Sequence, residues 1–154
     1  MGIEQLDHYS IRTPDLARAI RFYEDALGFH PGPRPPFDFS GAWMYTAPAA
    51  GASEGRPIVH LTQVGAAAGG GDGGTATATG ALDHIAFAAS GIGELHARLD
   101  RLGMVFRERI VPTLGVHQVF IQDPDGVAIE LNYADPDDIA AGQHSLERRS
   151  IAAG

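Results

Sequence analysis

The sequence predicts an α+β fold built from two similar halves, each in the order strand, helix and three further strands. Leu-Asp-His occurs at 6–8 and again at 82–84, each time at the start of an alternating, strand-like segment. An amphipathic helix follows each of these strands and ends at a glycine, Gly28 in one half and Gly103 in the other. Because the same features recur in the same order, we expect two βαβββ modules.

The first module is expected to cover residues 3–64. Its opening strand is predicted at 6–11, where apolar and polar residues alternate. Thr13 is the predicted N-cap of the helix, and Pro14 suits the first helical position, where a missing N–H costs nothing. Three more strands are predicted near 30–34, 41–47 and 57–64.

A linker and a second module follow. Residues 65–80, GAAAGGGDGGTATATG, are too poor in large apolar side chains to build a core, so they predict a flexible linker. The second module is expected to cover 81–134, and a polar C-terminal tail, forming a short helix or fraying, to cover 135–154. The module's later strands are predicted near 105–111, 116–122 and 127–133, with Asp-Pro-Asp-Gly as the last turn.

Composition narrows the classes of partner. The chain has 154 residues and a formal net charge of −8, which argues against nucleic acid or an anionic membrane as the main partner. It contains no cysteine, which excludes disulfides, thiolate ligands and a cysteine nucleophile. The N-terminal residues lack the pattern of a signal peptide, and no apolar run is long enough to span a membrane. We therefore expect a soluble, cytoplasmic protein.

Strand alternation places four ionisable side chains on the sheet faces away from the helices. Residues 127, 129, 131 and 133 form one apolar row, which leaves Glu130 on the other face. The same rule places His8, His60 and His84 on the faces away from the helices. A buried carboxylate is costly unless its charge is compensated, and a divalent cation shared with imidazoles would compensate it.

The segments LDHYSIRTPDLARAIRFYEDALGF, LDHIAFAA and VFIQDPDGVAIELNY resemble the vicinal oxygen chelate superfamily. That superfamily includes glyoxalase I, fosfomycin and bleomycin resistance proteins, and extradiol dioxygenases. The resemblance covers about residues 3–134 and implies two βαβββ modules whose mixed sheets curl around one metal. Ligands then come from the first and last strands of each module: His8, His60, His84 and Glu130. It also implies a small-molecule substrate with vicinal oxygens and a homodimer, in which the modules pair either within one chain or across the two chains.

The donor set limits the metal. Imidazole nitrogen combined with carboxylate oxygen suits divalent Fe, Ni, Zn, Co or Mn rather than Ca or Mg. His8, His84 and Glu130 alone match the arrangement of two histidines and one carboxylate found in non-haem Fe(II) oxygenases. The role of His60 stays open between a fourth ligand and an acid/base, and His60 and Glu130 are the predicted catalytic pair.

Three functions remain open, and we favour a metal-dependent enzyme with glyoxalase-like isomerase or lyase chemistry. In that chemistry the metal chelates vicinal oxygens and stabilises an enolate or catecholate. The alternative is an Fe(II) extradiol-type dioxygenase. Phe120 counts against it, because those enzymes commonly carry a Tyr at that place and Phe cannot donate a hydrogen bond. The third is a small-molecule-sequestering resistance protein, but bleomycin-binding members typically lack the metal ligands.

Four side chains are predicted to contact the substrate: Arg12, Phe120, Gln118 and His117. Arg12 is the only clear basic residue predicted on the faces away from the helices. Parity places His117 on the row opposite Glu130, so it reaches the pocket only if a bulge shifts the register. The aromatic residues Phe37, Phe39 and Trp43 are expected mainly in the core, and otherwise in a loop over the pocket.

Overall fold

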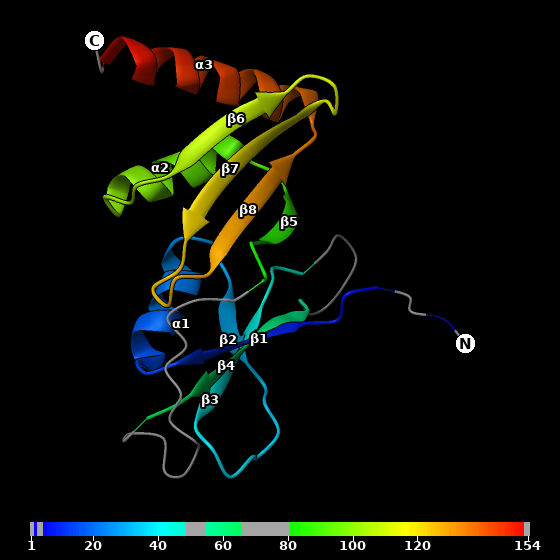
Figure 1. Cartoon of the computed structure of the whole chain (residues 1–154), viewed down its shortest axis with the longest axis vertical. Coiled ribbons are helices and arrows are strands. Elements are labelled where there is room, and N and C mark those ends of the chain that lie inside the picture. The colour runs from blue at the N-terminus through cyan, green and yellow to red at the C-terminus, as the bar shows by residue number, and fades with distance from the viewer. Residues whose placement is uncertain (1, 3–4, 49–54, 66–80, 153–154) are drawn as a thin grey trace. The chain divides into compact units, whose positions relative to one another are not determined.

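The computed structural model describes residues 2, 5–48, 55–65 and 81–152, and shows two four-stranded mixed sheets with three helices (Figure 1). The chain divides into two units, Met1–Thr77 and Ala78–Gly154. Each unit contains one sheet, which confirms the α+β class and the two βαβββ modules. Residues 66–80 of the predicted linker lie outside the described residues.

The first unit follows the order β1 (Tyr9–Thr13), α1 (Leu16–Asp25), β2 (His30–Gly32), β3 (Gly41–Tyr45) and β4 (Pro57–Gln63). In the sheet the strands are arranged β1-β4-β3-β2, with β1 parallel to β4 and the other neighbours antiparallel. Its core forms where α1, through the buried Ala19 and Tyr23, lies against β3 and β4. Val59 and Leu61 of β4 are buried, which leaves His60 on the other face.

The second unit repeats this topology and adds one helix. It runs β5 (Ile85–Ala89), α2 (Ile92–Arg101), β6 (Arg107–Val111), β7 (Val116–Gln122), β8 (Ala128–Tyr133) and α3 (Pro136–Ala152). The sheet order is β5-β8-β7-β6, and β5 is parallel to β8. Ile129 and Leu131 are buried in the core, so Glu130 lies on the opposite face, as alternation predicts.

The start of α1 differs from the prediction. Asp15, not Thr13, is the N-cap, and its side chain accepts a hydrogen bond from the backbone N–H of Arg18 at 3.0 Å. Thr13 instead ends β1, where its carbonyl accepts a hydrogen bond from Val64 at 2.9 Å. The predicted glycine ends are confirmed, because Gly28 and Gly103 adopt positive φ angles of 71° and 63°.

The polar tail forms the helix α3, which packs on α2 and on β6 and β7 (Figure 1). Asp138 of α3 accepts hydrogen bonds from the N–H groups of Gly91 and Ile92, at 2.9 and 2.8 Å. These N–H groups begin α2, whose N-cap, Gly91, has no side chain to satisfy them. The tail therefore belongs to the second unit and completes the start of α2.

Candidate functional site

Two matching Asp–His pairs precede the first strands of the two sheets. Nδ1 of His8 lies 2.7 Å from a carboxylate oxygen of Asp7, and Nδ1 of His84 lies 2.7 Å from one of Asp83. An aspartate can only accept at neutral pH, so Nδ1 carries the proton and the lone pair of Nε2 is left for a ligand. Metal-binding histidines are commonly oriented in this way. The hydrogen bond from His8 also holds the pKa of Asp7 below its usual value.

The imidazole of His60 is stacked between two other rings of the first unit. Its centroid lies 3.8 Å from that of His8 and 4.2 Å from that of Trp43, its cross-strand neighbour on β3. Nε2 of His60 is buried and has no hydrogen-bond partner in the part of the chain that the structure describes. Burial, with repulsion from His8, lowers the pKa of His60, so its imidazole is neutral at neutral pH.

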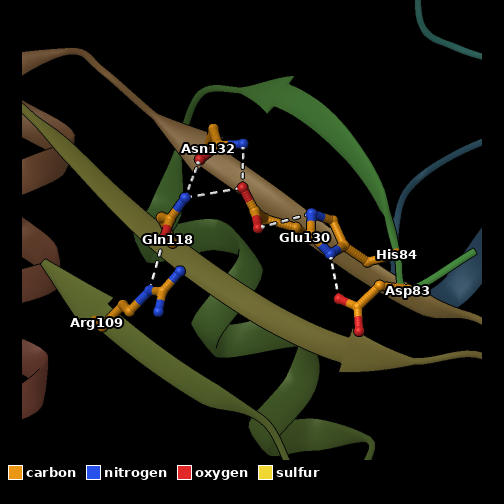
Figure 2. Close-up of polar contacts among 6 residues, drawn as sticks. All are labelled: Asp83, His84, Arg109, Gln118, Glu130 and Asn132. Atoms are coloured by element: carbon orange, nitrogen blue, oxygen red, sulfur yellow. Dashed lines mark hydrogen bonds and ion pairs between the residues drawn. The ribbon is translucent and has the colours of Figure 1, made fainter. Parts of the chain in front are cut away.

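Glu130 is the buried carboxylate of the second unit, with 6% of its surface exposed. One oxygen, Oε2, lies 3.2 Å from Nε2 of His84 (Figure 2). The other, Oε1, accepts hydrogen bonds from the side-chain amides of Gln118 and Asn132, at 2.8 and 2.7 Å. The two amides therefore fix one oxygen of Glu130 and leave the second directed at His84.

Arg109 sets the orientation of these amides. Its Nε donates to Oε1 of Gln118 at 2.7 Å, and because a guanidinium can only donate, the amide nitrogen of Gln118 must point the other way (Figure 2). That nitrogen donates to Glu130 and to Oδ1 of Asn132, the latter at 2.9 Å. Both N–H groups of Gln118 are therefore engaged with Glu130 and Asn132, and its contact with the substrate stays a prediction.

A cavity of about 360 Å³ opens on this face of the second sheet. Its walls include His84, Glu130 and Phe120, together with Arg107 and Arg109 of β6. Phe120 meets His84 edge to face, with the ring centroids 6.4 Å apart. The expectation that Arg12 is the only clear basic residue on such a face is wrong, because the alternation of Arg-Glu-Arg at 107–109 places two arginines there. Arg12 itself is exposed on β1, opposite Thr62.

The donor groups suit a divalent transition metal. The predicted ligands form two pairs, His8 with His60 in the first unit and His84 with Glu130 in the second. Two ligand atoms at right angles, each about 2.1 Å from a metal, are about 3 Å apart, and His84 Nε2 and Glu130 Oε2 are separated by 3.2 Å. The buried Nε2 of His60 also has no hydrogen-bond partner among the residues that the structure describes, and a metal would supply one. Among the described residues of either unit, no group of three or more His, Asp or Glu side chains is arranged to hold a metal.

Comparison with known proteins identifies the family. The sequence model of the Glyoxalase/Bleomycin resistance protein/Dioxygenase superfamily matches residues 5–131. The chain belongs to this superfamily. A protein of Arabidopsis thaliana named Glyoxylase I 4 is 29% identical over 135 residues, which cover 85% of this chain and 71% of the plant protein.

Solved structures of other superfamily proteins share the fold. A glyoxylase/bleomycin resistance protein/dioxygenase domain from Frankia sp. EAN1pec matches with a TM-score of 0.63 and 21% identity, covering 88% of this chain and 95% of its own. The fosfomycin resistance protein FosX from Listeria monocytogenes matches with a TM-score of 0.62 and 16% identity, over 89% of this chain and 98% of FosX. The trypanothione-dependent glyoxalase I of Leishmania major matches with a TM-score of 0.58 and 19% identity, over 99% of this chain and 100% of the Leishmania chain.

Within this superfamily member, His117 lies away from the cavity. It is fully buried on the helix-facing side of β7, and its Nε2 lies 2.9 Å from Oε2 of Glu108. Nε2 of His96, from α2, lies 2.9 Å from the same oxygen. The register has no bulge there, so His117 keeps the parity that opposes Glu130. Its predicted contact with the substrate is therefore corrected to a packing role beneath α3.

The aromatic residues of the 33–40 loop are not core residues. Phe37 and Phe39 are 45% and 40% exposed, with their ring centroids 5.1 Å apart. The guanidinium of Arg34 lies over both rings and donates a hydrogen bond to the carbonyl of Phe39 at 2.8 Å. Phe37 also meets Trp43, with the centroids 6.3 Å apart, which joins the loop to the stack on His60.

None of the helices in the described ranges is long and apolar enough to cross a membrane.

Proposed function

We propose that the protein is a divalent-metal-dependent enzyme that binds a small substrate through vicinal oxygens and performs glyoxalase-like isomerase or lyase chemistry. The proposal is carried by the two Asp–His pairs, each leaving Nε2 of its histidine for a metal, with Oε2 of Glu130 beside one of them. His8, His84 and Glu130 are the proposed ligands. His60 is the proposed fourth, because its buried Nε2 lacks a partner among the described residues.

The metal, the carboxylate of Glu130 and the two aspartates have different proposed roles in the reaction. A metal bound there would act as a Lewis acid on the two substrate oxygens and stabilise the negative charge of an enolate. Glu130 has two proposed roles through Oε2, since two amide donors restrain Oε1: Oε2 would hold the metal in the absence of substrate, and it would accept the proton once substrate oxygens take its place. Asp7 and Asp83 hold the imidazoles in the tautomer that presents Nε2.

Metal binding is the first test. Elemental analysis after anaerobic purification is expected to find one Fe, Ni, Zn, Co or Mn ion per chain, because each chain supplies one set of the four proposed ligands. Glu130→Ala is expected to lose the ion, whereas Glu24→Ala, which removes an exposed carboxylate from α1, is expected to keep it. If Glu130→Ala binds metal as well as the wild type does, the proposed ligand set is wrong.

The reaction is tested with the metal-loaded protein. Ni- or Zn-loaded protein is expected to convert hemithioacetals of methylglyoxal, or to epimerise a thioester, because both reactions pass through an enolate. Glu130→Gln keeps the size of the side chain but cannot accept the proton, so it is expected to lower kcat. Absence of turnover on both substrate types by fully loaded protein would contradict the glyoxalase-like assignment.

A dioxygenase is the second candidate, and the stacking of His60 favours it. His60 contacts His8 and Trp43 through its ring faces, so it can serve as an acid/base beside a three-residue site of His8, His84 and Glu130. In that case His60→Ala keeps the metal, and Fe(II)-loaded protein consumes oxygen with a catechol. If the wild type binds no metal, the small-molecule-sequestering resistance protein is the remaining candidate.

The proposal extends to a homodimer, the assembly that the resemblance implies, and to a cytoplasmic protein without nucleic acid or membrane partners. The formal net charge of −8 supports the second part, because nucleic acids and anionic lipids repel an acidic chain. Light scattering coupled to size-exclusion chromatography is expected to give twice the mass of one chain. A monomeric mass for the metal-loaded protein would contradict the dimer.

A further inference from the structure

Two arginines line the cavity and form no ion pair among the described residues. Arg107 and Arg109 lie two residues apart on β6, opposite Phe120 and Gln118 of β7, so both project from the same sheet face as Glu130. In the described part of the chain neither guanidinium forms an ion pair with a carboxylate. Arg56 and Arg98, by contrast, pair with Asp7 and Glu94.

Both guanidinium groups surround the ring of Phe120. The Cζ atoms of Arg107 and Arg109 lie 5.9 and 5.2 Å from its centroid. Nε of Arg109 donates to Gln118, whereas the terminal nitrogens of Arg109 and all the side-chain nitrogens of Arg107 form no hydrogen bond among the described residues. Phe120 cannot donate to a substrate, so the arginines supply the donors at this wall of the cavity.

We propose that Arg107 and Arg109 bind an anionic group of the substrate, a carboxylate, phosphate or phosphonate, while the ring of Phe120 packs against its carbon skeleton. Arginine matches such groups because its planar fork donates two parallel hydrogen bonds. Two cations held near each other in a chain of net charge −8 favour an anion between them. The catalytic meaning of this site rests on the proposed function, but anion binding itself does not require the metal.

The cavity indicates a small ligand. Its volume of about 360 Å³ lies near the lower end of the range of small-molecule pockets, roughly 300–1,000 Å³. The inferred substrate is therefore a small acid that presents vicinal oxygens at one end and its anionic group at the other.

The test uses the full chain after metal removal with EDTA, titrated calorimetrically with inorganic phosphate and, separately, with acetate. Saturable binding of at least one anion is expected, and Arg107→Gln is expected to weaken it about tenfold, the value of one charge-assisted hydrogen bond pair. Arg101→Gln makes the same change of charge on an exposed residue of α2, outside the cavity, and is expected to bind as the wild type does. Stronger binding of phosphate assigns a phosphate or phosphonate group, and stronger binding of acetate assigns a carboxylate.

Two results would overturn the inference: no saturable binding of either anion, or equal affinities for Arg107→Gln and Arg101→Gln. Zinc binding by Arg107→Gln is expected to match the wild type, because Arg107 contacts none of the proposed ligands in the described structure. If the wild type binds an anion but does not bind zinc, the proposed function is rejected and this inference is not. Intact zinc binding without anion binding would reject this inference alone.

Discussion

The repeated Leu-Asp-His places an aspartate directly before each histidine that is proposed as a metal ligand. His8 and His84 each lie one residue before a strand. The carboxylates of Asp7 and Asp83 orient the two imidazoles through Nδ1, at 2.7 Å in both cases. Asp7 and Asp83 were not predicted as site residues, although the repeated tripeptide carried the signal.

Removal of one of these carboxylates should weaken metal binding without removing a ligand. Asp83→Ala frees Nδ1 of His84, so the ring can rotate and exchange tautomers, and we expect the metal affinity to fall about 10- to 100-fold. Affinity is measured by competition with a chromophoric chelator. Asp25→Ala, at the exposed end of α1, is the control and should change nothing. Equal affinities for Asp83→Ala and wild type would show that Asp83 does not orient a ligand.

Gln118 is expected to matter through Glu130. Gln118→Leu removes a donor from Oε1 of Glu130 and leaves Nε of Arg109 without its acceptor, so the carboxylate becomes less restrained. We expect kcat to fall about tenfold or more with KM nearly unchanged. A change confined to KM would instead identify Gln118 as a substrate contact.

Residues that depend on neighbours in sequence were easier to predict than those that depend on neighbours in space. Alternation alone placed His60 and Glu130 away from the helices, and the structure agrees. The same rule applied to Arg-Glu-Arg at 107–109 would have found the cavity arginines. No local pattern could have shown that Gln118 is committed to Glu130, because that contact joins two strands and is oriented from a third.

At the scale of elements, α3 closes the helix-facing side of the second sheet over a buried polar cluster. His96 of α2 and His117 of β7 share one oxygen of Glu108 on β6, each at 2.9 Å. This cluster links three elements beneath α3, and the contacts of both imidazoles with Oε2 offset part of the cost of burying the Glu108 carboxylate. The close approach of α3 depends on Gly142, since a Cβ there would overlap the ring of His117 and lie 2.8 Å from Cδ1 of Ile92.

Substitution of Gly142 by alanine should therefore have the opposite effect on stability from the usual Gly→Ala change in a helix. In an open helix, Gly→Ala stabilises by roughly 0.5–1 kcal/mol. Gly142→Ala is expected to destabilise by about 1–3 kcal/mol, because α3 must move away from His117. Gly93→Ala in α2 is the matched control, since its Cβ would meet nothing within 4 Å and should not destabilise. Urea unfolding measures both changes, and stabilisation by Gly142→Ala would show that α3 does not pack as described.

The start of α2 should depend on a residue 46 positions away. Asp138→Ala removes the acceptor of the Gly91 and Ile92 N–H groups, and we expect a loss of about 1 kcal/mol of unfolding free energy. Asp137→Ala removes an exposed carboxylate of the same first turn and controls for its effect on the α3 dipole. Equal losses for the two variants would assign the effect to α3 rather than to α2.

Element boundaries show where local sequence signals compete. β7 covers Val116–Gln122, as predicted, because alternation and flanking turns agree. Thr13 could have capped α1, but its carbonyl joins the ladder through Val64, so the strand extends and the cap moves to Asp15. The length of α3 was not predictable from its polar sequence, because its stability comes from packing on α2, β6 and β7.

At the scale of the molecule, removal of the proposed metal should lower the stability of the folded chain. A ligand present at 100 times its Kd stabilises the folded state by about 2.7 kcal/mol, which corresponds to a Tm increase of about 5–10 °C for a chain of this size. We expect EDTA to lower the Tm of the wild type by that amount and to leave Glu130→Ala unaffected. Calorimetry measures both, and an equal shift in Glu130→Ala would place the stabilising ion elsewhere.

The two sheets have the same strand order, yet the middle of their fourth strands differs by one residue type, His60 in β4 and Glu130 in β8. Both side chains project from the face that carries no helix, so an exchange between them leaves the hydrophobic interior untouched. A substitution at either position could therefore change the charge on that sheet face by one unit without disturbing the core of its own unit. Relatives could then differ in reaction type while they keep one architecture, because ring contacts and hydrogen bonds hold these two side chains outside the hydrophobic core.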